Sequence, residues 1–264
     1  MVRSSEPLTP PPWPAPEAGP GWAFFLDVDG TLLEYADRPA GVHVSAELAE
    51  TLARLVHASD GAVALISGRA VSDVDRLFAP LVLPAAGQHG AERRRADGTY
   101  HLHPVLADGL RRVAEVLAGF TAEHPGVLLE DKGISLALHF RLRPELRDTV
   151  ESAVSRAAGA LGAAWTCQPG RLVYEIRPSG WDKGMAIADF MTEPPFAGRV
   201  AIFIGDDLTD EQGFTVVNRH GGLSVKVGAG ETAAGWRLPD AAAVRQWLDA
   251  CARRLAGHRP GDGL

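Results

Sequence analysis

The stretch WAFFLDVDGTLLEY, from Trp22 to Tyr35, decides the fold of this chain. Its apolar residues 23–26 form a short continuous hydrophobic run, which is typical of a strand buried on both faces of a parallel sheet. The run leads directly into two aspartates, Asp27 and Asp29, with one residue between them. Because a buried carboxylate is costly unless a cation meets it, the pair predicts a charged site at the end of this strand.

Alternating strands and helices surround this first strand in the sequence. Apolar runs bounded by turn residues predict further buried strands, and apolar residues at helical spacing predict helices between them. The predicted strands lie at 61–67, 81–87, 199–207 and 222–228, and the predicted helices at 46–56, 71–78, 182–191, 209–220 and 240–255. Short connections between alternating strands and helices imply right-handed crossovers. We therefore predict an α/β fold with a Rossmann-like parallel sheet.

The pattern changes after the segment GAERRRADGTYHLH, residues 90–103, in which Asp97-Gly98 predicts a hairpin turn. Two predicted helices then alternate with two predicted hairpins, which indicates an antiparallel α+β unit. The helices are expected at 105–124 and 144–162, and the hairpins at 126–141, turning at Lys132-Gly133, and at 163–178, turning at Pro169-Gly170. We expect this unit, residues 104–178, to be a domain inserted into a core formed by 22–103 and 179–264.

Composition and charge exclude several classes of protein. The chain has 264 residues, 46% of them hydrophobic, and a net charge of 26 − 33 = −7, which gives no sign of a nucleic-acid-binding surface. Its two cysteines cannot form a disulfide framework. No apolar run reaches the roughly 18 residues of a membrane span. Residues 1–21 hold seven prolines and lack the apolar segment of a signal peptide, so they predict a disordered tail. We expect a cytoplasmic monomer that binds neither nucleic acid nor membrane.

Polar residues follow three of the predicted strands at the point where each strand ends. In an open parallel sheet, ligands bind at these carboxyl ends. The ends read Asp27-Val28-Asp29-Gly30-Thr31, Ser67-Gly68-Arg69 and Gly205-Asp206-Asp207, the last followed by Asp210 and Glu211. Lys183 lies near the start of the helix that precedes the third of these strands. We expect acidic groups, a hydroxyl and an ammonium group to converge at one edge of the sheet.

This set of residues suits phosphoryl transfer. Mg²⁺ binds carboxylates together with phosphate oxygens and water, and a carboxylate can attack a phosphate neutralised in this way to give an aspartyl phosphate. Asp27 is the candidate nucleophile, and Asp29, on the same side of the extended chain, is the candidate general acid and base. We expect the metal to be held by Asp27, Asp29 and Asp206, with Asp207 and Asp210 behind them, and the phosphate by Gly30, Thr31, Ser67, Gly68 and Lys183. For Asp207 and Glu211, capping of a helix N-terminus is the simpler interpretation.

Four segments together resemble the haloacid dehalogenase-like (HAD) phosphatase superfamily. DVDGT at 27–31 resembles its first motif, Ser67 its second, Lys183 its third and GDDLTD at 205–210 its acidic fourth. All four occur in order, each on the expected element. The resemblance implies that the inserted unit is the larger cap of this superfamily, which closes over the site and selects the substrate.

Longer segments resemble the trehalose-6-phosphate phosphatases, over about residues 22 to 250. They are DVDGTLLEYADRPAGVHVS, LISGRAVSDVDRLF, GQHGAE, EDKGISLALHFR, YEIRPSGWDKGMAI and GDDLTDEQGF. The resemblance implies Mg²⁺-dependent hydrolysis of trehalose 6-phosphate to trehalose and phosphate, the last step of trehalose biosynthesis. It also implies that Glu130, Lys132 and Glu175 contact sugar hydroxyls, and that Arg69, His89 and Gly90 take part in substrate binding, with Glu92 beside them at the core–cap junction.

Other activities stay open on the sequence. One is a phosphatase for another sugar phosphate, such as sucrose phosphate or mannosylglycerate phosphate. A second is a sugar phosphomutase on the same scaffold, which would release little free phosphate. A third is a non-catalytic regulatory module, which the filled catalytic positions disfavour.

Overall fold

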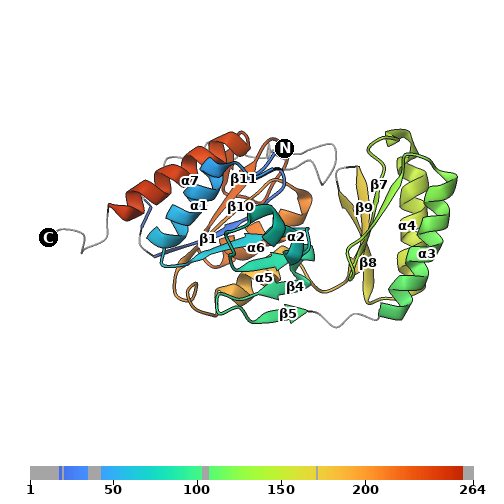
Figure 1. Ribbon diagram of the computed structural model, residues 1–264, viewed down its shortest axis with the longest axis horizontal. Coiled ribbons are helices and arrows are strands. Elements are labelled where there is room, and N and C mark those ends of the chain that lie inside the picture. Colours follow the sequence, from blue (N-terminus) through green and yellow to red (C-terminus); the bar gives the residue numbers. More distant parts are fainter. Residues whose placement is uncertain (1–17, 20, 35–42, 103–106, 171, 258–264) are drawn as a thin grey trace, which may run out of the picture.

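The computed structural model describes residues 18–19, 21–34, 43–102, 107–170 and 172–257. Two sheets organise these residues, a large one in the core and a smaller one in the inserted unit (Figure 1). Nearly all of the predicted Pro-rich tail, residues 1–21, lies outside the described residues, and so does the predicted domain boundary at 103–104. Among the described residues, no helix is long and apolar enough to cross a bilayer.

The large sheet has eight strands in the order β12-β11-β10-β1-β2-β3-β4-β5. The strands are β1 (Trp22–Leu26), β2 (Val63–Ile66), β3 (Ala85–Gly87), β4 (Glu92–Arg94), β5 (Tyr100–Leu102), β10 (Val200–Gly205), β11 (Leu223–Val227) and β12 (Trp236–Leu238). The six strands from β12 to β3 are parallel, and β4 and β5 continue the sheet antiparallel. The predicted hairpin at Asp97-Gly98 joins β4 to β5, whereas β12 was not predicted.

Helices cover both faces of this sheet, which explains the continuous apolar run in β1. Phe24 and Leu26 pack on one face and Ala23 and Phe25 on the other, because successive side chains of a strand alternate. The first face carries α1 (Ala46–Ala58), α2 (Val71–Phe78) and α7 (Ala241–Ala256), and the second carries α5 (Lys183–Phe190) and α6 (Glu211–Arg219). Ser45 caps α1 as predicted, accepting a hydrogen bond from the amide of Leu48 at 3.2 Å. The two-sided burial is what a parallel sheet requires.

The inserted unit is an antiparallel sheet with two helices on one face. Its strand order is β6-β7-β9-β8. Its elements are α3 (Ala107–Glu123), β6 (Leu128–Asp131), β7 (Leu136–His139), a short 3₁₀ turn η3 (Pro144–Leu146), α4 (Arg147–Leu161), β8 (Trp165–Gly170) and β9 (Val173–Pro178). Figure 1 shows α3 and α4 on the side of this sheet remote from the core. Both helices bury apolar residues against the strands in a separate hydrophobic core.

The fold class predicted from the sequence is confirmed, with one local correction. Pairing in the second hairpin continues through Pro169 and Gly170, which lie opposite Tyr174 and Val173. The turn of this hairpin therefore follows Gly170, whereas the sequence predicts it at Pro169-Gly170. The proline is tolerated because β8 is an edge strand of its sheet.

Candidate active site

The strand ends that carry polar residues are neighbours in the sheet. β1 lies between β10 and β2, and Leu26 is in register with Ile204 on one side and Leu65 on the other. The next residues along the chain are therefore brought to the same edge. The parallel topology explains how Asp27, Ser67 and Asp206 come together although they are far apart in the sequence.

A buried ammonium group links two carboxylates at this edge. Lys183, at the start of α5, is 3% exposed, and its Nζ donates to Oδ1 of Asp27 and to Oδ1 of Asp210, both at 2.7 Å. Burial opposes protonation of Lys183, but Asp210 and Asp27 outweigh it and raise its pKa. For Asp27 burial is the largest influence and raises its pKa well above the usual range. Lys183 opposes that rise, and Asp210 and Asp206 add to it.

Asp206 and Asp210 complete a group of carboxylates with Asp27. One ligand atom of each lies within 4.8 Å of those of the other two, so the group could hold a divalent metal ion. Three carboxylates meet beside the Lys183 ammonium, and hard oxygen donors of this kind suit such an ion. Gly30 permits the close approach, because it has φ +82° and a Cβ there would lie 2.2 Å from Oδ2 of Asp206. The Thr31 hydroxyl donates to Oδ1 of Asp206 at 3.5 Å.

Asp210 also fixes the backbone of the loop that carries it. Its Oδ2 accepts hydrogen bonds from the amides of Asp206 and Asp207, both at 2.9 Å. Asp207 caps the 3₁₀ turn η4 (Leu208–Asp210) by accepting from the amide of Leu208 at 2.6 Å. The capping interpretation of Asp207 is therefore confirmed. The sequence placed Asp210 behind the metal ligands, whereas the structure places its carboxylate among the three that face one another.

The carboxylate of Asp29 lies in a different pair. Arg69 donates through Nε to Oδ2 and through Nη2 to Oδ1 of Asp29, both at 2.6 Å. Burial lowers the pKa of Arg69, but the hydrogen bonds and charge of Asp29 outweigh it and raise that pKa. The amide of Arg69 in turn donates to the buried Ser67 hydroxyl at 3.0 Å. The loop after β2 thus holds the carboxylate of Asp29 through Arg69. The role of Asp29 as a metal ligand stays a prediction.

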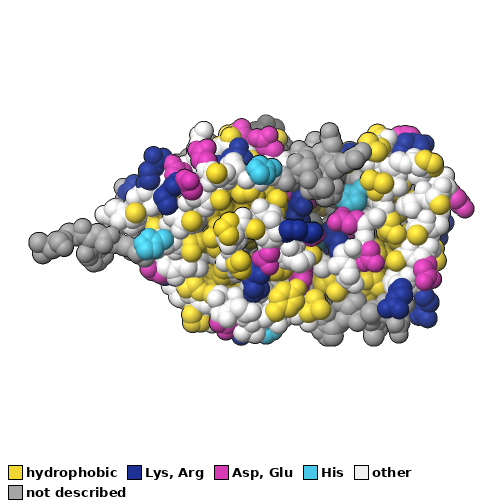
Figure 2. Space-filling view, viewed as in Figure 1, with side chains coloured by type: hydrophobic (Ala, Val, Ile, Leu, Met, Phe, Trp, Pro, Cys, Tyr) yellow, Lys and Arg dark blue, Asp and Glu magenta, His cyan; other side chains and the backbone are white. Residues whose placement is uncertain are grey.

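A cavity of about 150 Å³ opens beside these groups, between the core and the inserted unit. Figure 2 shows a hollow at this junction, with charged side chains gathered around it. Its lining includes Asp27, Asp29, Gly68, His89, Lys132, His139, Gln168, Pro169, Gly170, Val173, Glu175, Lys183, Asp207 and Thr209. Groups from the core and from the inserted unit therefore face one space.

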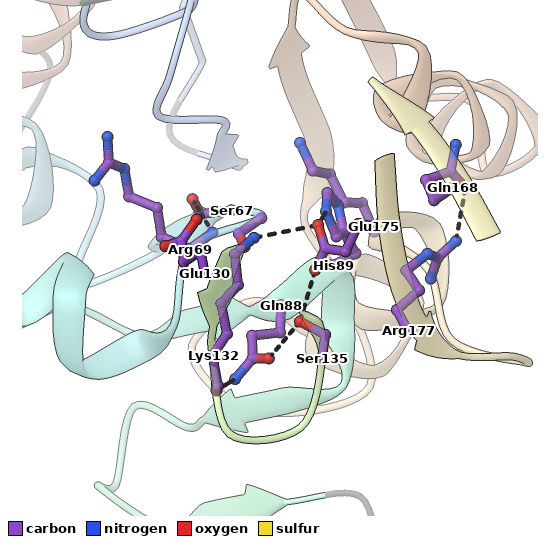
Figure 3. Close-up of polar contacts among 12 residues, drawn as sticks. Ser67, Arg69, Gln88, His89, Glu130, Lys132, Ser135, Gln168, Glu175 and Arg177 are labelled. Atoms are coloured by element: carbon purple, nitrogen blue, oxygen red, sulfur yellow. Dashed lines mark hydrogen bonds and ion pairs between the residues drawn. The ribbon is translucent and has the colours of Figure 1, made fainter. Parts of the chain in front are cut away.

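Glu175, on the inserted unit, is the centre of a buried polar network (Figure 3). Its Oε2 pairs with the Lys132 ammonium at 3.2 Å, and its Oε1 accepts from the Ser135 hydroxyl at 2.7 Å. Lys132 also donates to the carbonyl of Gly68 in the core at 3.2 Å. Burial opposes ionisation of Glu175, but Lys132, His89 and Ser135 outweigh it, so its pKa lies well below the usual range. The structure therefore brings Lys132 and Glu175 together at the site.

His89 lies where the core meets this network. It has φ +57° in the 3₁₀ turn η2 (Gln88–Gly90), a left-handed conformation that costs about 1–3 kcal/mol in a non-glycine residue. Its Nε2 lies 3.3 Å from Oε2 of Glu175, and its buried Nδ1 has no hydrogen-bond partner among the described residues. Burial, only partly opposed by Glu175, lowers the pKa of His89. Gly90 allows this turn to pack closely against Asp182, because a Cβ at position 90 would lie 2.6 Å from the carbonyl oxygen of Asp182.

Glu130, predicted to contact the sugar, and Glu92, predicted at the core–cap junction, both lie outside the lining of the cavity. Glu130 does not line the cavity, and its Oε2 instead pairs with Nε2 of His139 at 2.7 Å. This hydrogen bond from His139 is the main reason why the pKa of Glu130 is lowered. Glu92 accepts from the amide of Val71 at 2.7 Å and from the Tyr100 hydroxyl. It therefore supports the core side of the junction.

Sequence reasoning missed four polar residues at or beside the site. They are Gln88, Ser135, Gln168 and Thr209. His139 also lines the cavity, whereas in the sequence its alternation with Phe140 leaves it open between the site and solvent. Gln88 lies within the GQHGAE segment that carried the family resemblance, which was a signal that could have found it. The Thr209 hydroxyl is buried beside the cavity and has no hydrogen-bond partner among the described residues.

We expect Glu175→Gln to lower the free energy of unfolding by about 1.5–3 kcal/mol near neutral pH, the usual worth of a hydrogen bond to a charged group. Because the pKa of Glu175 is lower in the folded chain, its ionised form stabilises the fold above the unfolded pKa. That contribution is lost as the pH falls towards the folded pKa. Urea unfolding at about pH 7 and about pH 3 should show a smaller difference between wild type and variant at the lower pH. The exposed Glu115→Gln is the matched control, and an equal difference at both pH values would contradict the assignment.

The fold, a mostly parallel sheet with an inserted antiparallel unit, is that of the HAD-superfamily phosphatases. A solved phosphatase of the haloalkanoate (HAD) superfamily from Bacteroides thetaiotaomicron has the same fold, with a TM-score of 0.58 at 18% identity over 89% of this chain and 94% of that chain. The trehalose-phosphatase family model matches residues 25–242, and the chain belongs to this family.

Individual relatives agree with the family match. The trehalose-6-phosphate phosphatase of Escherichia coli (strain K12) is 44% identical over 245 residues, which cover 93% of this chain and 90% of the relative. A solved structure of a trehalose-6-phosphate phosphatase related protein is similar with a TM-score of 0.72 at 26% identity, covering 90% of this chain and 100% of that chain. The resemblance seen in the sequence motifs is therefore confirmed.

Proposed function

We propose that this protein hydrolyses trehalose 6-phosphate to trehalose and phosphate through an aspartyl-phosphate intermediate. The observation that carries the proposal is the cluster of Asp27, Lys183, Asp206 and Asp210, of which Asp27 and Lys183 line the same cavity as the polar groups of the inserted unit. Membership of the trehalose-phosphatase family supports the choice of substrate. The small-molecule substrate would enter at the junction of the two domains.

In the first step, Asp27 attacks the phosphorus of the substrate. Lys183 holds its Oδ1, which leaves Oδ2 as the proposed nucleophile. A bond forms between this oxygen and phosphorus while the bond from phosphorus to the sugar oxygen breaks. Asp29 donates its proton to the departing sugar oxygen. Because both oxygens of Asp29 are held by Arg69 in this structure, that pair has to open before the proton can be carried.

In the second step, a water molecule attacks the phosphorus of the aspartyl phosphate. Its proton passes to Asp29, the bond between Asp27 and phosphorus breaks, and inorganic phosphate leaves. Through both steps, Lys183, Ser67 and the backbone amides of Thr31 and Gly68 are proposed to hold phosphate oxygens, since charge-assisted hydrogen bonds are the strong ones. The amide of Gly30, expected from the sequence to join them, instead donates to the carbonyl of Leu33 at 2.7 Å.

The proposed cofactor is Mg²⁺, held by Asp27, Asp206 and Asp210, with Asp29 expected from the sequence as a further ligand. All of these groups offer hard oxygen donors, and three of the carboxylates lie close enough together to hold one ion. When bound, the ion would neutralise phosphate charge and make the phosphorus easier to attack.

Residues 104–178 are proposed to act as the cap that selects the sugar, over a core formed by 22–103 and 179–264. Lys132 and Glu175 would contact sugar hydroxyls directly, and Glu130 would act through His139, which lines the cavity. His89 would hold Glu175 from the core side. A site whose polar groups are left unpaired by the wrong sugar discriminates sharply between sugars.

Phosphate release from a panel of sugar phosphates tests the proposal. We expect trehalose 6-phosphate to be preferred over sucrose phosphate and mannosylglycerate phosphate, and activity to be lost with EDTA and restored by Mg²⁺. The controls are the same assays with Asp249→Asn, a substitution on α7 outside the cavity. No preference for trehalose 6-phosphate would overturn the substrate assignment. Formation of an isomer with little free phosphate would instead identify a phosphomutase.

A further inference from the structure

Two buried residues that take no part in the chemistry join the cap to the core. Gln88 belongs to the core turn η2, and Ser135 belongs to the turn between β6 and β7 of the cap. They are 3% and 0% exposed. The Ser135 Oγ lies 3.0 Å from Oε1 of Gln88, and Nε2 of Gln88 donates to the carbonyl of Lys132 at 3.0 Å (Figure 3). The side chain of Gln88 is thus bonded to both ends of the cap turn.

The orientation of the Gln88 amide is fixed by its surroundings. Its Nε2 faces two acceptors, the carbonyl of Lys132 and, at 3.4 Å, Oε1 of Glu92. Reversing the amide would place its oxygen against both of these oxygens. The Oε1 of Gln88 therefore faces Ser135, and this contact is a hydrogen bond only when the Ser135 hydroxyl donates.

Ser135 has one proton but two neighbouring acceptors. Its Oγ lies 2.7 Å from Oε1 of Glu175 and 3.0 Å from Oε1 of Gln88. A hydroxyl group has a single hydrogen to donate. While Glu175 receives that hydrogen, Gln88 receives none, and the bond between core and cap is not made. The charged acceptor is preferred while Ser135 is the donor to Oε1 of Glu175, since Lys132 and His89 lie at its other oxygen, Oε2.

We propose that Ser135 and Gln88 are positioning residues that couple sugar binding to closure of the cap. The proposal rests on the proposed function, in which a sugar hydroxyl reaches Glu175. When that hydroxyl donates to Glu175, the Ser135 proton turns to Gln88 and completes the bond between cap and core. A phosphate ester without sugar hydroxyls cannot trigger this exchange.

The core side of this link is tied to the phosphate-holding loop. The amide of Gln88 donates to the carbonyl of Arg69 at 2.8 Å, and the amide of His89 donates to the carbonyl of Ser67 at 3.0 Å. The bond between Ser135 and Gln88 therefore fixes the cap turn relative to the loop that carries Ser67. Recognition of the sugar is coupled in this way to the geometry of the phosphate site.

The test compares a sugar phosphate with p-nitrophenyl phosphate, which has no sugar hydroxyls. Ser135→Ala and Gln88→Met should each lower kcat/KM for trehalose 6-phosphate roughly 5- to 10-fold, mainly through KM, as loss of one hydrogen bond predicts. Activity on p-nitrophenyl phosphate should change by less than about twofold, and this also shows that the variants fold. The loss in the double variant should be smaller than the product of the two single losses, because both substitutions break the same bond between Ser135 and Gln88. The exposed Ser152→Ala and Gln246→Met are matched controls.

Other outcomes would overturn the coupling. An equal loss on both substrates would show a structural role alone, and effects that multiply in the double variant would show two independent contacts. Failure of the proposed function is distinguishable, because it shows in the wild type as a preference for another sugar phosphate. The same comparison is then made with that preferred sugar phosphate.

Discussion

Asp27→Asn is expected to lower turnover of the sugar phosphate by at least about 10⁴-fold, the scale on which loss of a nucleophile acts in other enzymes. The asparagine amide has nearly the size of the carboxylate but cannot form the aspartyl phosphate. Binding should survive, because the cap groups and Lys183 stay in place. Rates of phosphate release and the Kd of trehalose 6-phosphate measure the two effects separately.

The same substitution should make the metal-free protein more stable. Asp27, Asp206 and Asp210 lie close together, with Lys183 as the cation between two of them. Removing one of three like charges relieves their repulsion, so the melting temperature in EDTA should rise by a few degrees while stabilisation by Mg²⁺ becomes smaller. Asp249→Asn, in a half-exposed pair with Arg54, is the matched control. Retained turnover, or a lower melting temperature in EDTA, would contradict the assignment.

The parts of the site that could be predicted from the sequence depend on local signals. The apolar run before Asp27 predicts a buried parallel strand, and the topology of such sheets then brings the strand ends at Ser67 and Asp206 beside it. The place of Lys183 at the site could be predicted because it lies near the start of the helix that precedes the strand ending at Asp206. Each of these predictions needs only the element type and its place in the sheet.

The missed contacts depend on how separate elements dock. Ser135 and Gln88 are 47 residues apart and lie in different domains, so no periodicity links them. The pairing of Asp29 with Arg69 depends on side-chain conformations across two strand ends. The place of Asp210 among the carboxylates depends on the tight 3₁₀ turn after Asp207. Such details follow from tertiary packing, which a local pattern does not encode.

Lys183→Met is expected to abolish turnover and to lower the free energy of unfolding by about 3–5 kcal/mol in EDTA, the usual cost of removing one partner of a buried ion pair. Methionine has a similar length but leaves Asp27 and Asp210 facing each other without their shared cation. Urea unfolding in EDTA and in Mg²⁺ measures the loss. Part of it should be recovered in Mg²⁺, because a bound cation takes over the neutralisation of the carboxylates.

A double variant separates charge from packing in this prediction. If repulsion between carboxylates causes the loss, Asp27→Asn should stabilise the Lys183→Met protein more than it stabilises the wild type, since it removes an unpaired neighbour. If lost packing causes it, the two changes in unfolding free energy should simply add. Arg219→Met, at the exposed end of α6, removes a cation far from the carboxylates and should cost less than about 0.5 kcal/mol. Additive effects, together with no recovery in Mg²⁺, would show that Lys183 does not balance the charge of this site.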